Sequence, residues 1–465
     1  MSIENLDMTT YRKMNKIMKK ISFSDICRGL LATAVAAMLL PSCQPEYSVL
    51  PPTPEEKPVV DANQMVIYEC NERLFAENNA FKAIEDYIPT LEEMGVNVLW
   101  LMPIHPVGAD SKAVGSPYCV KDYTAINPAF GTMDDLKHLV STAHEHNMRV
   151  ILDWIANHTS WDNPWTTVHP DWYQSAQTAD EQQWADVTFL NYSLPVVCDT
   201  MQACMLYWVN ETDIDGFRCD YAQGVPLSFW KSTISAIRAK KSDALMLAET
   251  SDPAHYDAGF DLLYSWSFMY AVEGLYSGSG TFGSLLSAHT SEYNSTPEDK
   301  DRMRYVTTHD ESATAAPGTF YRTPQGELSA FCLTAFLSGV PMIYSSQELG
   351  NMNAINFFNY TIMDFKADNT TRNALKQLMK TYHETAHLRG GKRTTGSLNT
   401  KVHYVEYTDE KETMIVVCNT ANKEQEVKLP MKHQGHEVTD LITGEKLTLG
   451  TTTTLASYEY KIYKH

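Results

Sequence analysis

Two charged residues lie close together at the end of an apolar segment. Arg218 and Asp220 are two residues apart in the segment GFRCD, residues 216–220, and alternate residues of a strand share a face. Burial of either charge is unfavourable unless the charge is paired. The spacing alone leaves two interpretations open: a structural ion pair, or a carboxylate that a guanidinium keeps ionised for chemistry.

Other polar side chains end apolar segments in the same manner. They are Asp153, Asn157 and His158 in one segment, Glu249 in a second, and His309 and Asp310 in a third. Where parallel strands close into a barrel, their carboxyl ends meet at one rim, and active sites are built there. We therefore expect these side chains to gather at one candidate active site.

Eight short apolar segments between about residues 65 and 350 read as strands that position these side chains. They are MVIYEC, VNVLWLMPI, RVILDWIANH, DIDGFRCD, ALMLAET, FDLLYSW, MRYVTTHD and VPMIYSSQE. Several are almost wholly apolar, as parallel strands covered on both faces are. Apolar stripes at helical spacing lie between them, namely Phe81, Ile84, Ile88 and Leu91; Leu136, Leu139, Val140 and Ala143; and Phe229, Ile234 and Ile237. This alternation predicts an α/β fold, a (β/α)₈ TIM barrel.

The chain divides into further regions by composition. The barrel is expected over residues 65–390, with a short irregular insertion after the third strand at residues 159–198, which is rich in Trp, Asp and Pro. Long irregular excursions in compact domains are usually functional. After GGKRTTGS the pattern alternates and carries turn residues, which predicts an antiparallel β-sandwich domain over residues 391–465.

The N-terminal residues resemble a bacterial lipoprotein signal. Basic residues precede the apolar run from Gly29 to Leu40, which is too short to span a bilayer, and Leu40-Pro41-Ser42-Cys43 resembles a lipobox. We expect a signal peptide at residues 1–42, lipidation of Cys43, a proline-rich tether at residues 43–64, and a cell-envelope location on the periplasmic or surface face of the outer membrane. The alternatives are an unmodified cysteine after a cleaved signal, and a translation start at Met14 or Met18.

Composition narrows the classes of partner. The chain has 465 residues, 43% hydrophobic and 20% charged, with a net charge of −20. This negative charge repels phosphate backbones and disfavours a nucleic-acid partner. The cysteines beyond the signal are scattered without metal-ligand spacing, and we interpret most of them as small buried hydrophobic residues.

Six segments resemble, in order, the motifs of α-amylase-type members of glycoside hydrolase family 13. They are GSPYCVKDYTAINPAFGT (115–132), DWIANH (153–158), GFRCD (216–220), LAET (247–250), TTHD (307–310) and GVPMIYSSQE (339–348). Each motif is short, but six in the family's order are highly specific. The resemblance runs from Val66 into the C-terminal β domain.

The resemblance implies a retaining glycoside hydrolase with two carboxyl groups flanking the anomeric carbon. Asp220 would be the nucleophile, kept ionised by Arg218, which Asp153 would brace. Glu249 would be the acid, in a poorly solvated site that raises its pKa. Asp310 would hold sugar hydroxyls as charge develops on the ring.

The resemblance also implies residues that hold the sugar. Tyr118 would stack on the ring, His158 and His309 would bind its hydroxyls, and Asn157 would support the site. The insertion offers four further aromatic candidates, which we interpret as mainly structural with one or two reaching the cleft: Trp161, Trp165, Trp172 and Trp184.

The chain departs from the family pattern at several positions. Thr308 stands where asparagine is common, and Gln223 and Gly224 stand where many α-amylases have a lysine and a histidine. Phe189 replaces an aspartate that is often a calcium ligand, and Asn157 alone cannot supply six to eight oxygens. We therefore expect no metal site and no required cofactor.

These observations predict a monomeric enzyme that cleaves α-1,4 bonds in starch-derived α-glucans, with membrane contact only through the lipid anchor. Two alternatives within the family remain: a hydrolase acting on cyclodextrins or pullulan (cyclomaltodextrinase or neopullulanase), and an α-glucanotransferase. An alternative of another class is a glucan-binding protein without turnover.

Overall fold

The computed structural model describes residues 62–110, 112, 115–175 and 184–465. The expected signal peptide, Cys43 and all but the last residues of the expected tether lie outside these residues. Ala62–Gln64 form the short 3₁₀ helix η2. The carbonyl of Gln64 accepts a hydrogen bond from the side chain of Asn97 at 2.7 Å, so this end of the tether lies against the barrel. Within the described residues no helix has the length and apolarity needed to cross a membrane.

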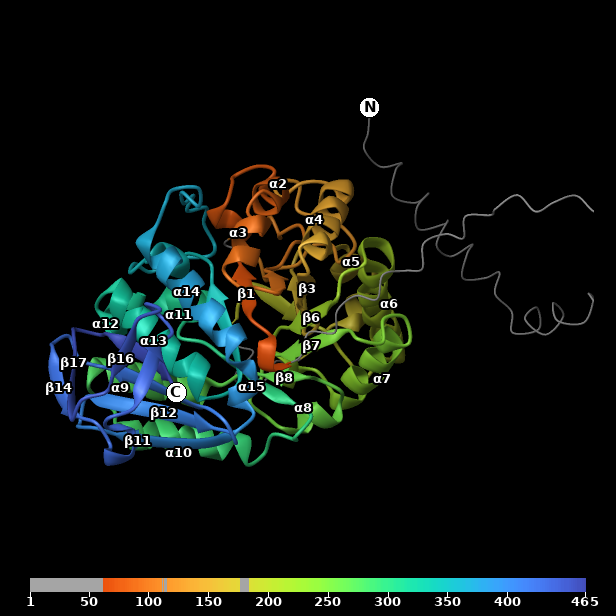
Figure 1. The fold of residues 1–465 in the computed structure, drawn as a ribbon. Helices are drawn as coiled ribbons and strands as arrows, with labels where there is room; N and C mark the ends of the chain where they lie inside the picture. Colours follow the sequence, from red (N-terminus) through yellow and green to blue (C-terminus); the bar gives the residue numbers. More distant parts are fainter. Residues whose placement is uncertain (1–61, 111, 113–114, 176–183) are drawn as a thin grey trace, which may run out of the picture. The chain divides into compact units, whose positions relative to one another are not determined.

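Eight parallel strands close into a barrel in the order β1-β10-β9-β8-β7-β6-β3-β2 (Figure 1). Their bounds are β1 Ile67–Cys70, β2 Val98–Leu101, β3 Arg149–Trp154, β6 Gly216–Cys219, β7 Leu245–Ala248, β8 Leu262–Leu263, β9 Asp301–Arg304 and β10 Val340–Tyr344. Seven of these strands lie within the segments expected to form strands, whereas β9 begins at Asp301, ahead of its expected segment. The (β/α)₈ fold is confirmed.

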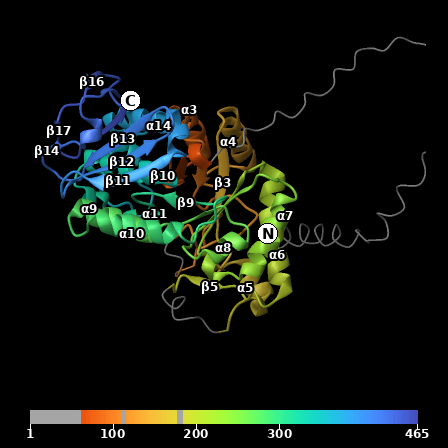
Figure 2. The same ribbon diagram turned by 60° about the horizontal axis from the view of Figure 1, so that its bottom comes forward.

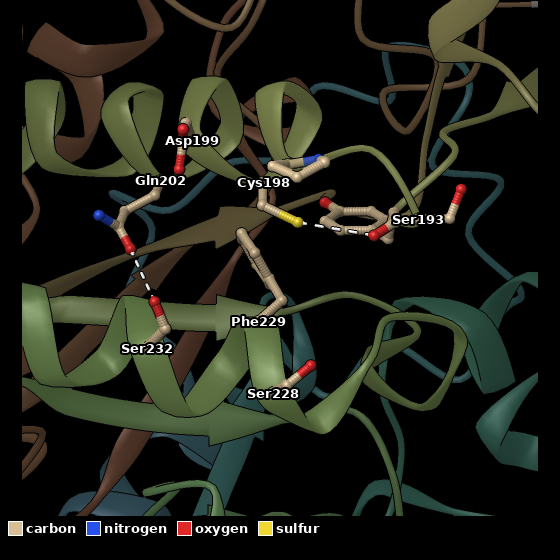
Figure 3. Close-up of a pocket in the computed structure, with 9 residues that line it drawn as sticks. Ser193, Cys198, Asp199, Gln202, Ser228, Phe229 and Ser232 are labelled. Carbon is tan, nitrogen blue, oxygen red and sulfur yellow. Dashed lines mark hydrogen bonds between the residues drawn. The ribbon is translucent and has the colours of Figure 1, made fainter.

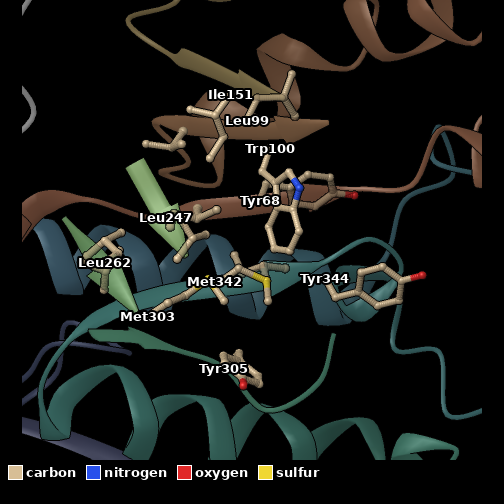
Figure 4. Close-up of a cluster of buried hydrophobic side chains, with 14 of the residues drawn as sticks. Tyr68, Leu99, Trp100, Ile151, Leu247, Leu262, Met303, Tyr305, Met342 and Tyr344 are labelled. Atoms are coloured by element: carbon tan, nitrogen blue, oxygen red, sulfur yellow. The ribbon is translucent and has the colours of Figure 1, made fainter. Parts of the chain in front are cut away.

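Large apolar side chains fill the space within and around the barrel strands. Figure 4 shows the side chains of Leu99 and Trp100 from β2, Ile151 from β3, Leu247 from β7 and Met342 from β10, and all five are fully buried. A barrel packed in this way leaves no pore, so polar chemistry is confined to its rim.

Helices follow the strands and cover the barrel (Figure 1). They are α2 Ala80–Glu85, α3 Ile88–Glu93, α4 Met133–Glu145, α6 Pro195–Thr212, α7 Leu227–Arg238, α8 Ala254–Asp257, α9 Trp266–Ser277, α10 Phe282–Tyr293, α11 His309–Thr314, α12 Pro317–Tyr321, α13 Pro324–Leu337, α14 Thr370–Glu384 and α15 Ala386–Arg389. Every residue of the three apolar stripes is buried. The first stripe is shared by α2 and α3, because the chain turns at Asp86 and Tyr87.

The insertion after β3 is more regular than expected. Strands β4 (His158–Ser160) and β5 (Val187–Phe189) pair antiparallel, and α5 (Pro164–Val168) and the 3₁₀ helix η4 (Pro170–Trp172) lie between them. The insertion also ends earlier than residue 198, since α6 begins at Pro195. The expectation of an irregular segment is wrong here because elements of three to five residues are too short to show a period.

The C-terminal residues form antiparallel sheets, as expected (Figures 1 and 2). One sheet has the order β11-β12-β13-β18-β15-β16, and β14 pairs with β17. Their bounds are β11 Lys392–Ser397, β12 Val402–Thr408, β13 Thr413–Asn419, β14 Gln425–Lys428, β15 Glu437–Asp440, β16 Lys446–Thr448, β17 Thr452–Leu455 and β18 Tyr460–Lys464. The hydroxyl of Tyr407 donates to the carbonyl of Phe336 at 3.0 Å, which joins the sheet to α13.

Candidate active site

The guanidinium of Arg218 lies at the centre of the site. Its Nη1 is 2.8 Å from Oδ1 of Asp153 and 2.9 Å from Oδ1 of Asp220. Strands β3 and β6 pair Asp153 directly with Arg218, and neither side chain is exposed to solvent. Arg218 therefore takes part in both kinds of interaction that its spacing from Asp220 suggested. It forms a buried ion pair with Asp153, and the same guanidinium binds Asp220.

Glu249 shares the same guanidinium. Its Oε1 lies 3.1 Å from Nη2 of Arg218, and its Oε2 accepts a hydrogen bond from the backbone N–H of Tyr221 at 2.6 Å. Burial raises the pKa of Glu249 to about 8, because the nearby charges of Asp220 and Asp310 add to desolvation and outweigh the opposing effect of Arg218. This carboxyl group therefore carries a proton at neutral pH.

The register of the barrel accounts for this pairing of carboxyl groups. Strands β6 and β7 align Cys219 with Ala248, so Asp220 and Glu249 each come one residue after a matched pair. The backbone N–H of Glu249 donates to the carbonyl of Cys219 at 3.0 Å and extends this alignment. Two acidic side chains at the same level of neighbouring strands can act on one bond from two sides.

Asp310 and His309 begin helix α11. The hydroxyl of Thr308 caps this helix by accepting from the N–H of Asp310 at 3.2 Å. The Asp310 side chain is 54% exposed, and its Oδ1 lies 3.5 Å from Nε2 of His309. Thr308 thus uses its hydroxyl for the helix terminus and leaves the Asp310 carboxylate accessible at the rim.

Tyr118 connects His309 with the arginine cluster. Its hydroxyl lies 2.7 Å from Nε2 of His309 and 3.2 Å from Oδ2 of Asp153. The Tyr118 ring stacks on the His309 ring with centroids 5.2 Å apart and an angle of 18°. One face of Tyr118 is thus occupied by His309, which orients the ring for the stacking role that we predict for it.

His158 lies on β4, in a more aromatic environment than the other residues of the site. Phe189 is its direct partner on β5, and the ring of Trp184 lies 6.2 Å from the His158 ring. Asn157 contacts it, with Nδ2 3.5 Å from Nδ1 of His158. The His158 side chain is buried, and its ring packs against Trp184 and Phe189 of the insertion.

The four tryptophans of the insertion differ in position. Trp184 packs edge-on against Tyr221 with centroids 4.7 Å apart, which brings it next to the residue after Asp220. Trp165 stacks on Tyr123, Trp172 stacks on His169, and Trp161 lies under the ammonium of Lys112. Among the four, Trp184 is the one in contact with a neighbour of the carboxyl pair.

Several residues that contact the cluster were missed by the sequence analysis. Glu69 on β1 bonds Nδ1 of His309. The indole N–H of Trp100 donates to Oδ2 of Asp153 at 3.2 Å, and Nε of Arg218 donates to the hydroxyl of Tyr264 at 3.2 Å. Glu69 carried a usable signal, since it is an acidic residue within an apolar segment. The two aromatic residues carried none, because Trp100 and Tyr264 each lie in a segment that reads as ordinary buried strand.

The residues at the family's usual calcium position do not fit such an ion. Phe189 places a buried apolar ring opposite His158. The described residues also contain no group of three His, Cys, Asp or Glu side chains arranged to hold a metal. A hard cation needs several oxygen ligands, and among the described residues Phe189 supplies none at this position.

Tyr221 and Gly224 fit each other closely. Tyr221 has a left-handed backbone with φ of 38°. A Cβ at position 224 would lie 2.5 Å from the Tyr221 ring and 2.7 Å from Oδ1 of Asn157. The Tyr221 ring therefore takes up the space that a side chain at position 224 would need.

A separate pocket of about 260 Å³ lies between α6 and α7 (Figure 3). It is lined by Tyr192, Ser193, Pro195, Cys198, Asp199, Gln202, Ser228, Phe229 and Ser232. None of the residues expected at the site lines it. The described cysteines form no disulfide, and all but Cys198 are buried.

The chain is similar in sequence to known α-amylase-type proteins. Residues 79–189 match the family model for the alpha amylase catalytic domain. The chain is 27% identical over 409 residues to the alpha-amylase MalA of Haloarcula japonica, covering 83% of this chain and 59% of that protein. It is 25% identical to a cyclomaltodextrinase of Geobacillus thermopakistaniensis, covering 82% of this chain and 69% of that one. The chain thus spans under two thirds of the length of MalA.

Solved structures show the same fold. The maltogenic alpha-amylase AmyB of Thermotoga neapolitana superimposes with a TM-score of 0.77 at 24% identity, over 87% of this chain and 99% of that chain. An alpha-amylase of Lactobacillus plantarum gives a TM-score of 0.76 at 24% identity, with the same coverage. The fold and the site define an α-amylase-like barrel protein. These similarities in sequence and fold support an α-amylase-like enzyme of glycoside hydrolase family 13.

Proposed function

We propose that this protein is a retaining glycoside hydrolase that cleaves α-1,4-glucosidic bonds in starch-derived glucans. The observation that supports this most directly is the sharing of one buried guanidinium by Asp220 and Glu249. Retaining glycosidases need one ionised carboxylate and one protonated carboxyl group beside the same bond. Arg218 binds the first through a hydrogen bond, and burial keeps the second protonated.

In the first step the Asp220 carboxylate attacks the anomeric carbon while Glu249 donates its proton to the glycosidic oxygen. The bond between that carbon and oxygen breaks, and the leaving glucan departs as an alcohol. In the second step the Glu249 carboxylate removes a proton from water, the water oxygen attacks the anomeric carbon, and Asp220 is released. Two inversions at one carbon retain its configuration.

Neighbouring side chains would hold the reacting sugar. Asp310, half-exposed at the start of α11, would accept hydrogen bonds from ring hydroxyls and oppose the positive charge that develops on the ring. His309 and His158 would bind further hydroxyls, and Tyr118 would present its second face to the ring. The net negative charge around the reaction centre suits an oxocarbenium-like transition state.

An NMR time course on maltooligosaccharides tests the proposal. The first product should carry the α-anomeric proton signal, and the β-anomer should appear only by mutarotation. Product lengths, compared with those from cyclodextrin and pullulan under the same conditions, give the mode of attack. Initial release of the β-anomer, or no cleavage of any α-glucan, would contradict the assignment.

A second candidate is hydrolysis of cyclodextrins or pullulan, with glucosyl transfer as a further variant. It is favoured by the match to a cyclomaltodextrinase over 82% of this chain. Higher kcat/KM on β-cyclodextrin than on maltoheptaose would establish this function. A glucan-binding protein without turnover keeps the barrel but needs no acid; the raised pKa of Glu249 argues against it.

We also propose that the protein is a monomer, is anchored at the cell envelope through lipidated Cys43, and requires no metal. The lipobox-like segment supports the anchor, and the apolar Phe189 supports metal independence. Radiolabelled palmitate should enter the wild-type protein and not Cys43→Ala. Activity should persist after dialysis against a chelator, and light scattering should give the mass of one chain.

A further inference from the structure

Glu69 is a buried acid at the edge of the candidate site, and none of the catalytic steps above uses it. It lies on β1 with no solvent exposure, 240 residues away from His309 in sequence. Its Oε1 bonds Nδ1 of His309, whereas its Oε2 has no hydrogen-bond partner among the described residues. A buried carboxylate is costly unless its charge is compensated, and the imidazole is the group in contact with it.

The ring of His309 is held on several sides. Tyr118 stacks on one face, and the edges of Trp100 and Phe357 pack against it at centroid distances of 6.2 and 5.0 Å. Charged and titratable groups face the ring from four elements and a loop: Glu69 on β1, Asp153 on β3, Arg218 on β6, Asp310 and Glu311 on α11, and Tyr118 between β2 and α4.

We infer that Glu69 is a positioning residue that keeps His309 protonated on both ring nitrogens and thereby sets the direction of a buried hydrogen-bond chain from β1 to Asp153. This inference rests on the proposed function for its effect on catalysis, whereas the protonation of His309 follows from its contacts and from the charges around it. Its role differs from that of Asp310, which faces the sugar.

The hydrogen-bond chain from Glu69 to Asp153 has a definite number of protons. An ionised Glu69 can only accept a hydrogen bond, and in that arrangement Nδ1 of His309 is the donor. If Nε2 also carries a proton, it donates to the Tyr118 oxygen at 2.7 Å, and the Tyr118 hydroxyl is left to donate to Asp153 at 3.2 Å. Every contact then has one donor and one acceptor.

A neutral His309 imidazole would leave one of these contacts without a donor. With its single proton on Nδ1, Nε2 would accept from the Tyr118 hydroxyl, and Oδ2 of Asp153 would lose that donor. With the proton on Nε2, a bare Nδ1 would face the Glu69 carboxylate. Burial favours the neutral ring, but Asp310 and Glu69 outweigh it and raise the pKa of His309 to about 10.

This hydrogen-bond chain affects the candidate active site because Asp153, at its end, also binds Arg218. Oδ1 of Asp153 accepts from Nη1 of Arg218, while Oδ2 accepts from Trp100 and Tyr118. The protonated His309 keeps Nε2–H as a fixed donor to the Tyr118 oxygen, which leaves the Tyr118 hydroxyl to donate to Asp153. Glu69 therefore acts at a distance on the support of the arginine.

The test is a ¹⁵N NMR titration of the full-length protein labelled at histidine, with the His309 signals assigned by their loss in His309→Asn. In the wild type, His309 should stay doubly protonated from pH 6 to beyond pH 8. In Glu69→Gln its pKa should fall by about 2, the usual effect of removing an adjacent opposite charge. A wild-type His309 that is neutral at pH 7.5 overturns the inference, even if the variant does not fold.

Kinetics supply the second readout. In Glu69→Gln, kcat/KM on maltoheptaose at pH 7 should fall by about tenfold to a hundredfold, as expected for a charge-assisted hydrogen bond, and the alkaline limb should move to lower pH. The matched control is Glu348→Gln, another fully buried glutamate, which accepts from the hydroxyls of Tyr68 and Tyr87. It should leave the His309 titration and the pH profile unchanged.

The outcomes distinguish this inference from the proposed function. If the wild type cleaves no α-glucan, the proposed function fails, while the His309 titration still decides the role of Glu69. If Glu69→Gln moves neither the His309 signal nor the pH profile, Glu69 is only a structural residue and the inference is wrong.

Discussion

The backbone N–H of Tyr221 donates to Oε2 of Glu249 at 2.6 Å, so the residue that follows the nucleophile also orients the acid. Tyr221 achieves this with a left-handed backbone, which is unusual for a residue with a side chain. The two carboxyl groups of the site are thereby fixed relative to each other by the main chain as well as by Arg218. Strain held at this turn is compatible with a functional role for the local geometry.

Replacement of the nucleophile should abolish turnover without unfolding the protein. Asp220→Asn keeps the volume of the side chain and retains one acceptor for Arg218, but an amide does not form the glycosyl ester. We expect kcat on maltooligosaccharides to fall by at least about 10⁴-fold, while glucan binding measured by calorimetry remains close to wild type. Near-normal turnover in this variant would mean that another residue is the nucleophile.

Replacement of the acid should affect substrates in proportion to their need for protonation. Glu249→Gln cannot protonate a glycosidic oxygen, so hydrolysis of maltooligosaccharides should fall by about 10³-fold or more. A maltosyl fluoride needs little protonation of its leaving group and should lose far less activity in the first step. Equal losses on both substrates would exclude the acid role of Glu249.

The pH profile should have an alkaline limb set by Glu249. The acid must be protonated, and burial raises its pKa to about 8; kcat/KM should therefore be maintained at neutral pH and decline as pH rises through about 8. Initial rates on maltoheptaose between pH 5 and 10 measure this limb. Decline with a midpoint near pH 5 would show that Glu249 is ionised in the working enzyme.

The same carboxyl group should make stability depend on pH. Its folded-state pKa lies above the unfolded value, so the unfolded chain ionises first and the fold loses stability as pH rises from about 4.5 to about 8. Glu249→Gln has no such penalty. Its Tm should exceed that of the wild type by a margin that grows across this pH range, as scanning calorimetry in matched buffers would reveal. A constant difference from pH 4 to pH 9 would contradict the shifted pKa.

A methyl group at position 224 should disturb the turn beside the nucleophile. In Gly224→Ala the new Cβ would lie 2.5 Å from the Tyr221 ring, so that ring must move; we expect a loss of about 1–3 kcal/mol in stability and reduced kcat. Gly283→Ala is the matched control, since its Cβ would approach Thr281 no closer than 3.7 Å. Denaturant unfolding of both variants decides the comparison. If Gly224→Ala had the stability and the kcat of the wild type, the Tyr221 ring would have room to move away from position 224.

The barrel and the carboxyl residues were predictable because both depend on local sequence. Continuous apolar segments predict buried parallel strands, and Asp220 and Glu249 each follow such a segment directly, whereas Asp310 lies in α11 beyond the end of β9. Glu69 was not selected, since its partner is 240 residues away and only closure of the barrel brings them together. The strands β4 and β5 were missed because three residues carry no periodicity, and Tyr264 because a tyrosine near a strand end is ordinary core composition.

Closure of the barrel has a consequence for synthesis of the chain. Strand β1, near the start of the described residues, pairs with β10 and aligns Ile67 with Met342. The hydrogen bond between Glu69 and His309 joins residues that are 240 positions apart in the sequence. Contacts so distant in sequence form late, after the intervening segments have collapsed. A ribosome-bound chain that stops before residue 340 can fold its early βα units. It lacks the pairing of β1 with β10 that closes the barrel, so catalysis should appear only after the last barrel strand has been synthesised.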